Sequence, residues 1–137
     1  MNALRAHNGA DAYRSIRTAG SVEDASPHQL IDMLLSGAIE RISQARGALQ
    51  QGDVARKGSA IGQAISIVEE LRASLDHERG GELTANLEAL YDYLQRRLLE
   101  ANLRNDDAAL AETAGLLGTV LEGWRAIPQQ LAAEGDA

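Results

Sequence analysis

The stretch from Leu75 to Asn102, LDHERGGELTANLEALYDYLQRRLLEAN, decides the fold of this chain. In its second half, apolar residues recur at spacings of three and four. At 100° per residue they fall on one stripe, which is typical of a helix packed in a bundle. The stripe consists of Leu83, Leu87, Leu90, Leu94, Leu98 and Ala101.

The residues around this stripe indicate how the helix begins and how its edges are used. Gly80 and Gly81 can adopt a positive φ that closes the preceding helix, and Glu82 then lies in the first turn of the next one. Tyr91 and Tyr93 fall on opposite edges of the stripe, where a ring can be buried while its hydroxyl reaches water. The segment therefore predicts a helix end, a break and a long amphipathic helix.

Capping residues place another helix before this segment. Ser26 is a favourable N-cap, Pro27 suits the first helical position, and Gln29 stands where a capping box needs Glu or Gln. The helix is expected to run to about Gln50. Its inward side is formed by Ile31, Leu34, Ala38, Ile42, Ala45 and Leu49.

Two further helices complete the pattern. Asp53 is expected to cap one that runs to about Glu78, and Asn105 to Asp107 supply a loop and a cap for the last one, which ends before Pro128. Their inward residues are Ile61, Ile65, Val68 and Leu75 in the former, and Leu110, Ala114, Leu117, Leu121 and Trp124 in the latter.

Short connections make consecutive helices antiparallel neighbours, so the expected fold class is all-α, an antiparallel up-down four-helix bundle. We expect residues 1–25 to form a flexible N-terminal arm or cap that can carry a short helix around 10–16. Residues 26–127 form the bundle, and residues 128–137 form a flexible acidic tail. Strands are not expected, because no segment alternates with a period of two.

Composition narrows the class of protein. The chain has 137 residues, which suits one domain, and a net charge of −7 without a basic stripe, which argues against nucleic acid as a partner. It has no cysteine, so disulfides and thiol chemistry are not expected. Neither a signal peptide nor an apolar run long enough to enter a membrane is evident, which favours a cytoplasmic protein.

No residue cluster suggests catalysis, a metal or a cofactor. A di-iron bundle needs Glu-x-x-His pairs, and His7, His28 and His77 each lack a Glu three residues earlier. All three are expected to be solvated. A phosphotransfer histidine would need a nearby lysine. The only lysine is Lys57, which is on a different predicted helix from His28 and far from His77 along the predicted helix that they share. We therefore expect a protein that is not an enzyme.

Some apolar residues lie outside the predicted core stripes. Leu116, Val120 and Ile127 form a second line beside the stripe of the last helix, while Leu99 and Leu103 lie nearly opposite the stripe of the third. Met33 is similarly out of line in the first helix. These residues either wrap around neighbouring helices or are single exposed side chains, which are common. Alternatively, they form a groove that accepts amphipathic helices of another chain.

Seven glycines fall inside the predicted helices, where each costs roughly 0.5–1 kcal/mol relative to alanine. Close approach of neighbouring helices at Gly58 and Gly62, and at Gly115 and Gly118, could recover part of this cost. A marginally stable free bundle, stabilised by a bound partner, is expected. The seven are Gly37, Gly47, Gly58, Gly62, Gly115, Gly118 and Gly123.

Three segments resemble the family of the flagellar export chaperone FliS. The pattern LD-x-x-x-GGEL-x-x-NL-x-x-LYDYL-x-x-RL-x-x-AN is similar to the signature of that family, ASPHQL at 25–30 resembles the opening of its first bundle helix, and Asp11-Ala12-Tyr13 resembles its N-terminal segment. One departure is Leu35-Ser36-Gly37, where the family commonly has Tyr-Asp-Gly. The motif residues are Ser26, Pro27, Gly80, Gly81, Asn86, Tyr91, Tyr93 and Asn102.

The resemblance implies a cytoplasmic export chaperone that binds the disordered C-terminal segment of flagellin, one to one, and prevents its premature polymerisation. It implies delivery to the flagellar type III export apparatus through the gate protein FlhA, and FlgM is a partner of some members. It also implies that Tyr13 and Ile16 dock on the bundle until flagellin displaces them. The residues alone leave open a phosphotransfer or signalling bundle and a self-associating structural bundle.

Overall fold

The computed structural model describes residues 25–127, and four α-helices make up most of this part of the chain. They are α2 (Pro27–Gln50), α3 (Val54–Ala73), α4 (Gly81–Arg104) and α5 (Asp107–Ala126). No strand occurs between residues 25 and 127. The prediction of an all-α four-helix fold is confirmed.

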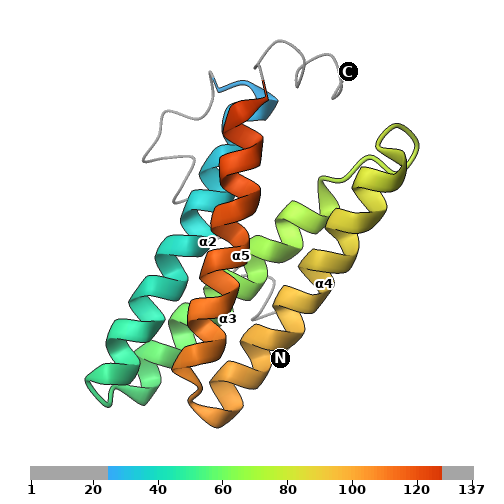
Figure 1. The fold of residues 1–137 in the computed structure, drawn as a ribbon. Helices are drawn as coiled ribbons and strands as arrows, with labels where there is room; N and C mark the ends of the chain where they lie inside the picture. The colour runs from blue at the N-terminus through green and yellow to red at the C-terminus, as the bar shows by residue number, and fades with distance from the viewer. Residues whose placement is uncertain (1–24, 128–137) are drawn as a thin grey trace.

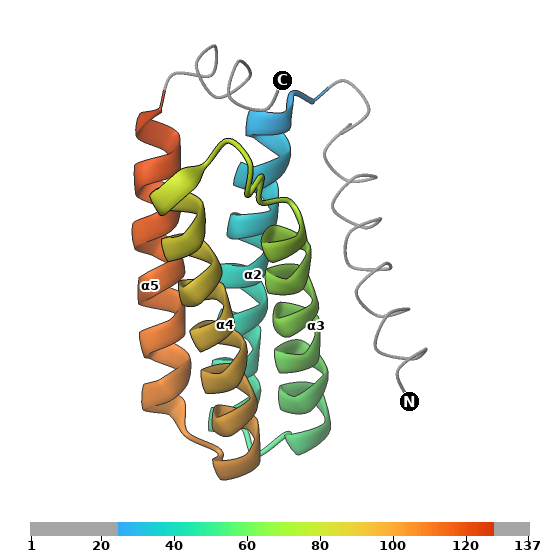
Figure 2. The same ribbon diagram turned by 90° about the vertical axis from the view of Figure 1, so that its right-hand side faces the viewer.

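The helices form an up-down ring in which α2 packs against α3 and α5, and α4 packs against the same two (Figure 1, Figure 2). The α2–α3 interface is the most extensive and the α4–α5 interface the least. We call the end where α2 and α4 begin the upper end, as drawn in Figure 1. There, α3 and α4 lean away from α2 and α5, and the loop that joins α3 to α4 stands clear of the end of α5.

The predicted helix starts are confirmed by their caps. Ser26 accepts a hydrogen bond from the amide of Gln29 at 3.2 Å, and the Gln29 side chain accepts one from the amide of Ser26 at 2.9 Å, which completes the capping box. Asp53 and Asp106 each accept an amide hydrogen bond from three residues further on, both at 3.1 Å. These contacts satisfy amides that the first helical turn leaves without partners.

The predicted end of α3 was wrong. The helix was expected to reach about Glu78, but it ends at Ala73 and is followed by a loop, residues 74–80. The carboxylate of Asp76 accepts hydrogen bonds from the amides of Glu78, at 3.0 Å, and Arg79, at 3.2 Å. Aspartate side chains that bond to the backbone in this way favour a turn over a helix.

The glycine pair therefore opens α4 and does not close α3, which corrects the second expectation for this segment. Gly80 is the N-cap of α4, and Gly81 has a φ of +54°, a conformation that glycine adopts without strain. A Cβ atom on Gly80 would lie 1.4 Å from Oγ1 of Thr84. Residue 80 must be glycine for the chain to pass this close to Thr84.

The core draws on all four helices and is built almost entirely from aliphatic side chains. Leu35, which lies in the tripeptide that departs from the family pattern, is fully buried although the predicted stripe of α2 omitted it. Leu83 is the reverse case, because it lies on the predicted stripe of α4 but is 63% exposed where α4 leans outward. The largest fully buried aliphatic residues are Leu35, Ile42, Ile61, Ile67, Val68, Leu71, Leu94, Leu98, Leu110 and Leu117.

Gly58, Gly62, Gly115 and Gly118 do not mark close helix approach, contrary to expectation. A Cβ atom on Gly62, Gly115 or Gly118 would meet nothing within 4 Å, and one on Gly58 would meet only Asn102 Oδ1 at 3.8 Å. The packing of the described residues therefore does not compensate their cost in helix propensity. None of the helices within 25–127 is both long and apolar enough to cross a membrane.

Candidate partner-binding site

One row of side chains on α5 faces α4. Glu112, Leu116 and Val120 follow one another at intervals of four, so they lie on one side of the helix. Glu112 accepts hydrogen bonds from two residues of α4, namely Tyr93 Oη at 2.7 Å and Arg97 Nε at 2.7 Å. Leu116 and Val120 continue this row toward the upper end, and both are half-buried against the core.

The hydrogen bonds to Glu112 close the interface between α4 and α5 near its middle. The Arg97 and Tyr93 donors lower the pKa of the Glu112 carboxyl, and the bond to Glu112 raises the pKa of the Tyr93 hydroxyl. Tyr93 is 37% exposed, so water screens the interactions of Glu112 with Tyr93 and Arg97. Arg97 also pairs with Glu100 of its own helix. The contact at Glu112 orients the two helices more than it stabilises them.

Above this contact, the two helices present apolar side chains that are incompletely covered. Because α4 and α5 are antiparallel, the first turns of α4 and the last turns of α5 are both at the upper end, where the two helices diverge (Figure 1). Leu87 and Leu90 are half-buried and Leu83 is exposed, while Val120 and Ile127 on the α5 side are half-buried. We call the apolar residues on the two sides of this divergence the α4–α5 seam. It consists of Leu83, Leu87, Leu90, Leu116, Val120 and Ile127.

A pair of aromatic rings joins α2 to α5 at the upper end. His28 and Trp124 stack with ring centroids 4.8 Å apart and an angle of 14° between the planes. Trp124 Nε1 donates to the His28 carbonyl at 2.9 Å, and His28 Nε2 lies 3.0 Å from the Trp124 carbonyl. The expectation that His28 is solvated was wrong, because the beginning of α2 and the end of α5 meet at this residue.

An ion pair one turn along the same interface supports this contact. Arg125 donates to both carboxylate oxygens of Asp32, at 2.8 and 3.1 Å, and to Ser36 Oγ at 3.3 Å. The Arg125 hydrogen bonds lower the pKa of the Asp32 carboxyl. A similar pair, Arg46 with Asp107, joins the same helices at the other end of the bundle.

The only lysine anchors the carboxyl end of α4. Lys57 is buried, and its ammonium donates to the Asn102 carbonyl at 2.9 Å and to Oδ1 of Asn105, the C-cap residue, whose φ is 52°. A cation at the C-terminus of a helix complements the helix dipole. Because the acceptor at Asn102 is the backbone carbonyl, this contact does not explain the side chain of that motif residue. No local pattern in the sequence indicates that Lys57 is buried.

The structure divides the predicted partner-binding residues into separate surfaces. Leu116, Val120 and Ile127 lie in the seam, whereas Leu99 and Leu103 are 52% and 77% exposed on the outer side of α4, away from it. Met33 is half-buried on α2. Tyr13 and Ile16 lie outside the described residues. The predicted single groove is therefore at least two surfaces.

The remaining motif residues have structural positions. Tyr91 is 3% exposed, and burial raises the pKa of its hydroxyl to about 12. Asn86 is exposed on the second turn of α4. His77 was expected at the end of a helix but lies in the loop, where its Nε2 is 3.0 Å from Glu88 Oε2. Among the described residues, no three acidic, histidine or cysteine side chains gather where they could hold a metal ion.

Comparison with known proteins identifies close relatives. Residues 9–131 match the family model of the flagellar protein FliS. The chain is 50% identical over 121 residues to the flagellar secretion chaperone FliS of Salmonella typhimurium, which covers 88% of this chain and 90% of the relative. It is 47% identical to the flagellar secretion chaperone FliSB of Pseudomonas aeruginosa, with 84% and 91% covered. It is 37% identical to that of Bacillus subtilis, with 77% of each chain covered.

Proposed function

The chain belongs to the FliS family of flagellar secretion chaperones, and from this we propose that it binds the disordered C-terminal segment of flagellin in the cytoplasm. The bound segment folds as helices on the bundle, one flagellin to one chaperone. Its burial prevents premature polymerisation and protects the segment from proteolysis. The role is that of a binding protein and not of an enzyme.

The observation that carries this proposal is the exposure of Leu83 on a stripe that is fully buried from Leu94 onward. Leu83 shares its face of α4 with Leu94 and Leu98, which are fully buried, yet it is 63% exposed. We propose that Leu83, together with half-buried Val120 and Ile127 of α5, contacts the apolar face of a partner helix. The α4–α5 seam is therefore our first contact site for flagellin.

The outer side of α4 supplies a second contact. Leu99 and Leu103 are four residues apart, so they project from one face of the helix and could pack against one partner helix. Disordered segments that fold on binding can wrap around large surfaces and so reach separate sites. A flagellin segment of several helices could contact the seam and this pair, and Met33 on α2 would be a third point.

The N-terminal arm is the proposed occupant of the apolar surface in the free protein. It joins the bundle at Ala25, at the upper end, where α4 and α5 diverge. The nine Cα-to-Cα steps from Ile16 to Ala25 could span about 30 Å when extended, which is the length of most of a helix here. We propose that Tyr13 and Ile16 dock on the bundle and that flagellin displaces them.

Delivery of the complex to the export gate is the last step of the proposed function. FlhA is the proposed receptor, and FlgM is a possible regulatory partner. Two other classes of function have less support. A phosphotransfer bundle needs an exposed histidine beside a lysine. The Lys57 ammonium lies at the carboxyl end of α4, whereas His28 lies beside Trp124 at the upper end of the bundle. A self-associating bundle would bury the seam against a second copy.

A matched pair of variants tests the seam. Val120→Asp places a charge in the seam, and Val54→Asp makes the same change at a 64%-exposed site at the beginning of α3. We expect the first variant to weaken binding of a C-terminal flagellin peptide at least tenfold and the second to leave it unchanged. Equal affinity of both variants, with both folded by circular dichroism, would remove the seam from the proposal. A free chain that sediments as a dimer would favour self-association.

A further inference from the structure

The two halves of α4 are attached to the bundle in different ways. All side-chain hydrogen bonds from α4 or its C-cap to α3 and α5 in the described structure involve residues from Tyr93 onward. Tyr93 and Arg97 bond to Glu112, and Gln95 bonds to Glu69 and to the carbonyl of Ile65. Lys57 binds the carboxyl end. Residues 81–92 make no such bond to another helix within the described part of the chain.

Apolar packing shows the same division. Leu94 and Leu98 are fully buried, whereas Leu87 and Leu90 are half-buried and Leu83 is mostly exposed. Within residues 81–90 only Thr84 is buried. Helical segments with few buried contacts and exposed backbone hydrogen bonds open most readily.

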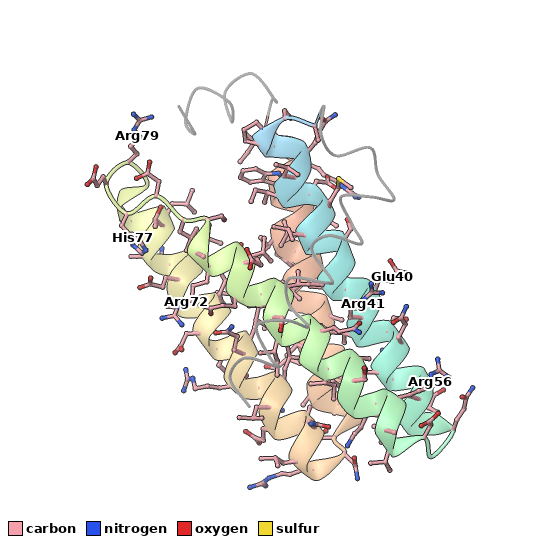
Figure 3. The ribbon with its side chains drawn as sticks, turned by 180° about the vertical axis from the view of Figure 1, so that it is seen from behind. Glu40, Arg41, Arg56, Arg72, His77 and Arg79 are labelled. Atoms are coloured by element: carbon pink, nitrogen blue, oxygen red, sulfur yellow. The ribbon has the colours of Figure 1, made fainter. Side chains whose placement is uncertain are left out.

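The first turns of α4 are instead bonded to the loop that precedes them. Thr84 Oγ1 donates to the Asp76 carbonyl at 3.3 Å, and His77 pairs with Glu88. Gly80 allows the chain to pass against Thr84. Figure 3 shows Arg79 at the tip of this loop, which projects away from the beginning of α2, and His77 beside α4.

We propose that the loop and the first ten residues of α4, residues 74–90, unfold as one unit while the rest of the bundle stays folded. We call this unit the flap. The contacts of Tyr93 and Arg97 with Glu112 mark where it ends. Its opening removes Leu83, Leu87 and Leu90 from the seam and leaves the Leu116 and Val120 row of α5 in place. This property of the fold does not depend on which partner the protein binds.

Native-state amide hydrogen exchange of the free, full-length protein tests the proposal. The first amides of α4 lack helical hydrogen bonds, so the comparison begins at residue 85. We expect amides 85–90 to share one exchange rate, after correction for intrinsic rates, that is at least a hundredfold faster than that of amides 94–101. Uniform protection along α4 would overturn the proposal. A steady gradient from residue 85 onward would also overturn it, since that is end fraying and not a unit.

A variant separates the flap from the remaining bundle. Thr84→Val keeps the size of this buried side chain but removes its hydrogen bond to the loop. Thr119→Val is the control, because it makes the same change at an exposed site in α5, where the Thr119 hydroxyl bonds to the Gly115 carbonyl of the same helix. We expect Thr84→Val to accelerate exchange of amides 85–90 several-fold and to leave amides 94–101 and those of α2 unchanged. An equal acceleration in all helices, or none in the flap, would contradict the proposal.

Discussion

His28 and Trp124 join the beginning of α2 to the end of α5, and each side chain bonds to the backbone carbonyl of the other residue. One lies in the first turn of α2 and the other in the last turn of α5. The first five residues of α2 and the last five of α5 contain no fully buried side chain. This polar and aromatic contact therefore closes a part of the bundle in which no side chain is fully buried.

Replacing His28 should destabilise this end. The His28→Ala variant loses the ring stack and one hydrogen bond, so we expect the free energy of unfolding to fall by about 1–2 kcal/mol. The measurement is urea unfolding followed by circular dichroism. His77→Ala is the control, because His77 forms only an exposed pair with Glu88, and it should change stability by less than about 0.5 kcal/mol. Equal losses in both variants would show that the stacked pair adds nothing specific.

Lys57 should be sensitive to removal of its charge. Lys57→Met keeps most of the aliphatic stem but leaves the Asn102 carbonyl and the Asn105 side chain without their donor. Hydrogen bonds to charged groups contribute about 1.5–3 kcal/mol, so we expect a loss of about 2 kcal/mol. Arg56→Met, at the exposed neighbouring position, is the control and should change little. Similar unfolding midpoints for the two variants would rule out this anchoring role.

Alanine should stabilise the helices at glycines that have open space around them. Gly62→Ala and Gly118→Ala should each raise the free energy of unfolding by about 0.5–1 kcal/mol. Gly81→Ala should lower it, because residue 81 has a positive φ. Denaturant titration of the three variants checks the signs. A loss of stability at Gly62 or Gly118 would mean that these positions need glycine for another reason.

Tyr91 makes stability depend on alkaline pH. Burial raises the pKa of its hydroxyl to about 12 in the folded state, against about 10 when unfolded. A raised pKa gives stability that is fully present below pH 10 and is lost as the pH rises through 12. We expect wild type to lose about 1 kcal/mol more than Tyr91→Phe between pH 9 and pH 11. Parallel pH profiles of the two proteins would show that Tyr91 ionises as easily in the folded state as in the unfolded one.

Local signals in the sequence predicted most of the fold. Ser26, Asp53 and Asp106 specified the helix starts, since a cap acts within one turn and its residues are adjacent in sequence. The spacing of Leu94 and Leu98 identified the core side of α4. The error at the end of α3 came from Asp76, whose side chain competes with the helix for backbone amides, and apolar periodicity does not reveal that competition.

The candidate site was less predictable because it depends on how the helices are oriented. On a helical wheel, Leu83 falls on the core side of α4, and only the outward lean of α4 exposes it. His28 and Lys57 each bond to residues far along the chain, at Trp124 and Asn102, so no local pattern reveals their partners. The exposure of Leu99 and Leu103 could be predicted, because both lie opposite a strong stripe.

Titration calorimetry of the full-length protein with a peptide of about forty residues from the C-terminus of the host flagellin tests the central claim most directly, with helicity followed by circular dichroism. The account predicts one-to-one binding, a gain in helix and a negative change in heat capacity, because a disordered segment folds while it buries apolar surface. It also predicts that Val120→Asp weakens this binding and that Val54→Asp does not. An absence of binding at tens of micromolar peptide would contradict the proposed role as a flagellin chaperone.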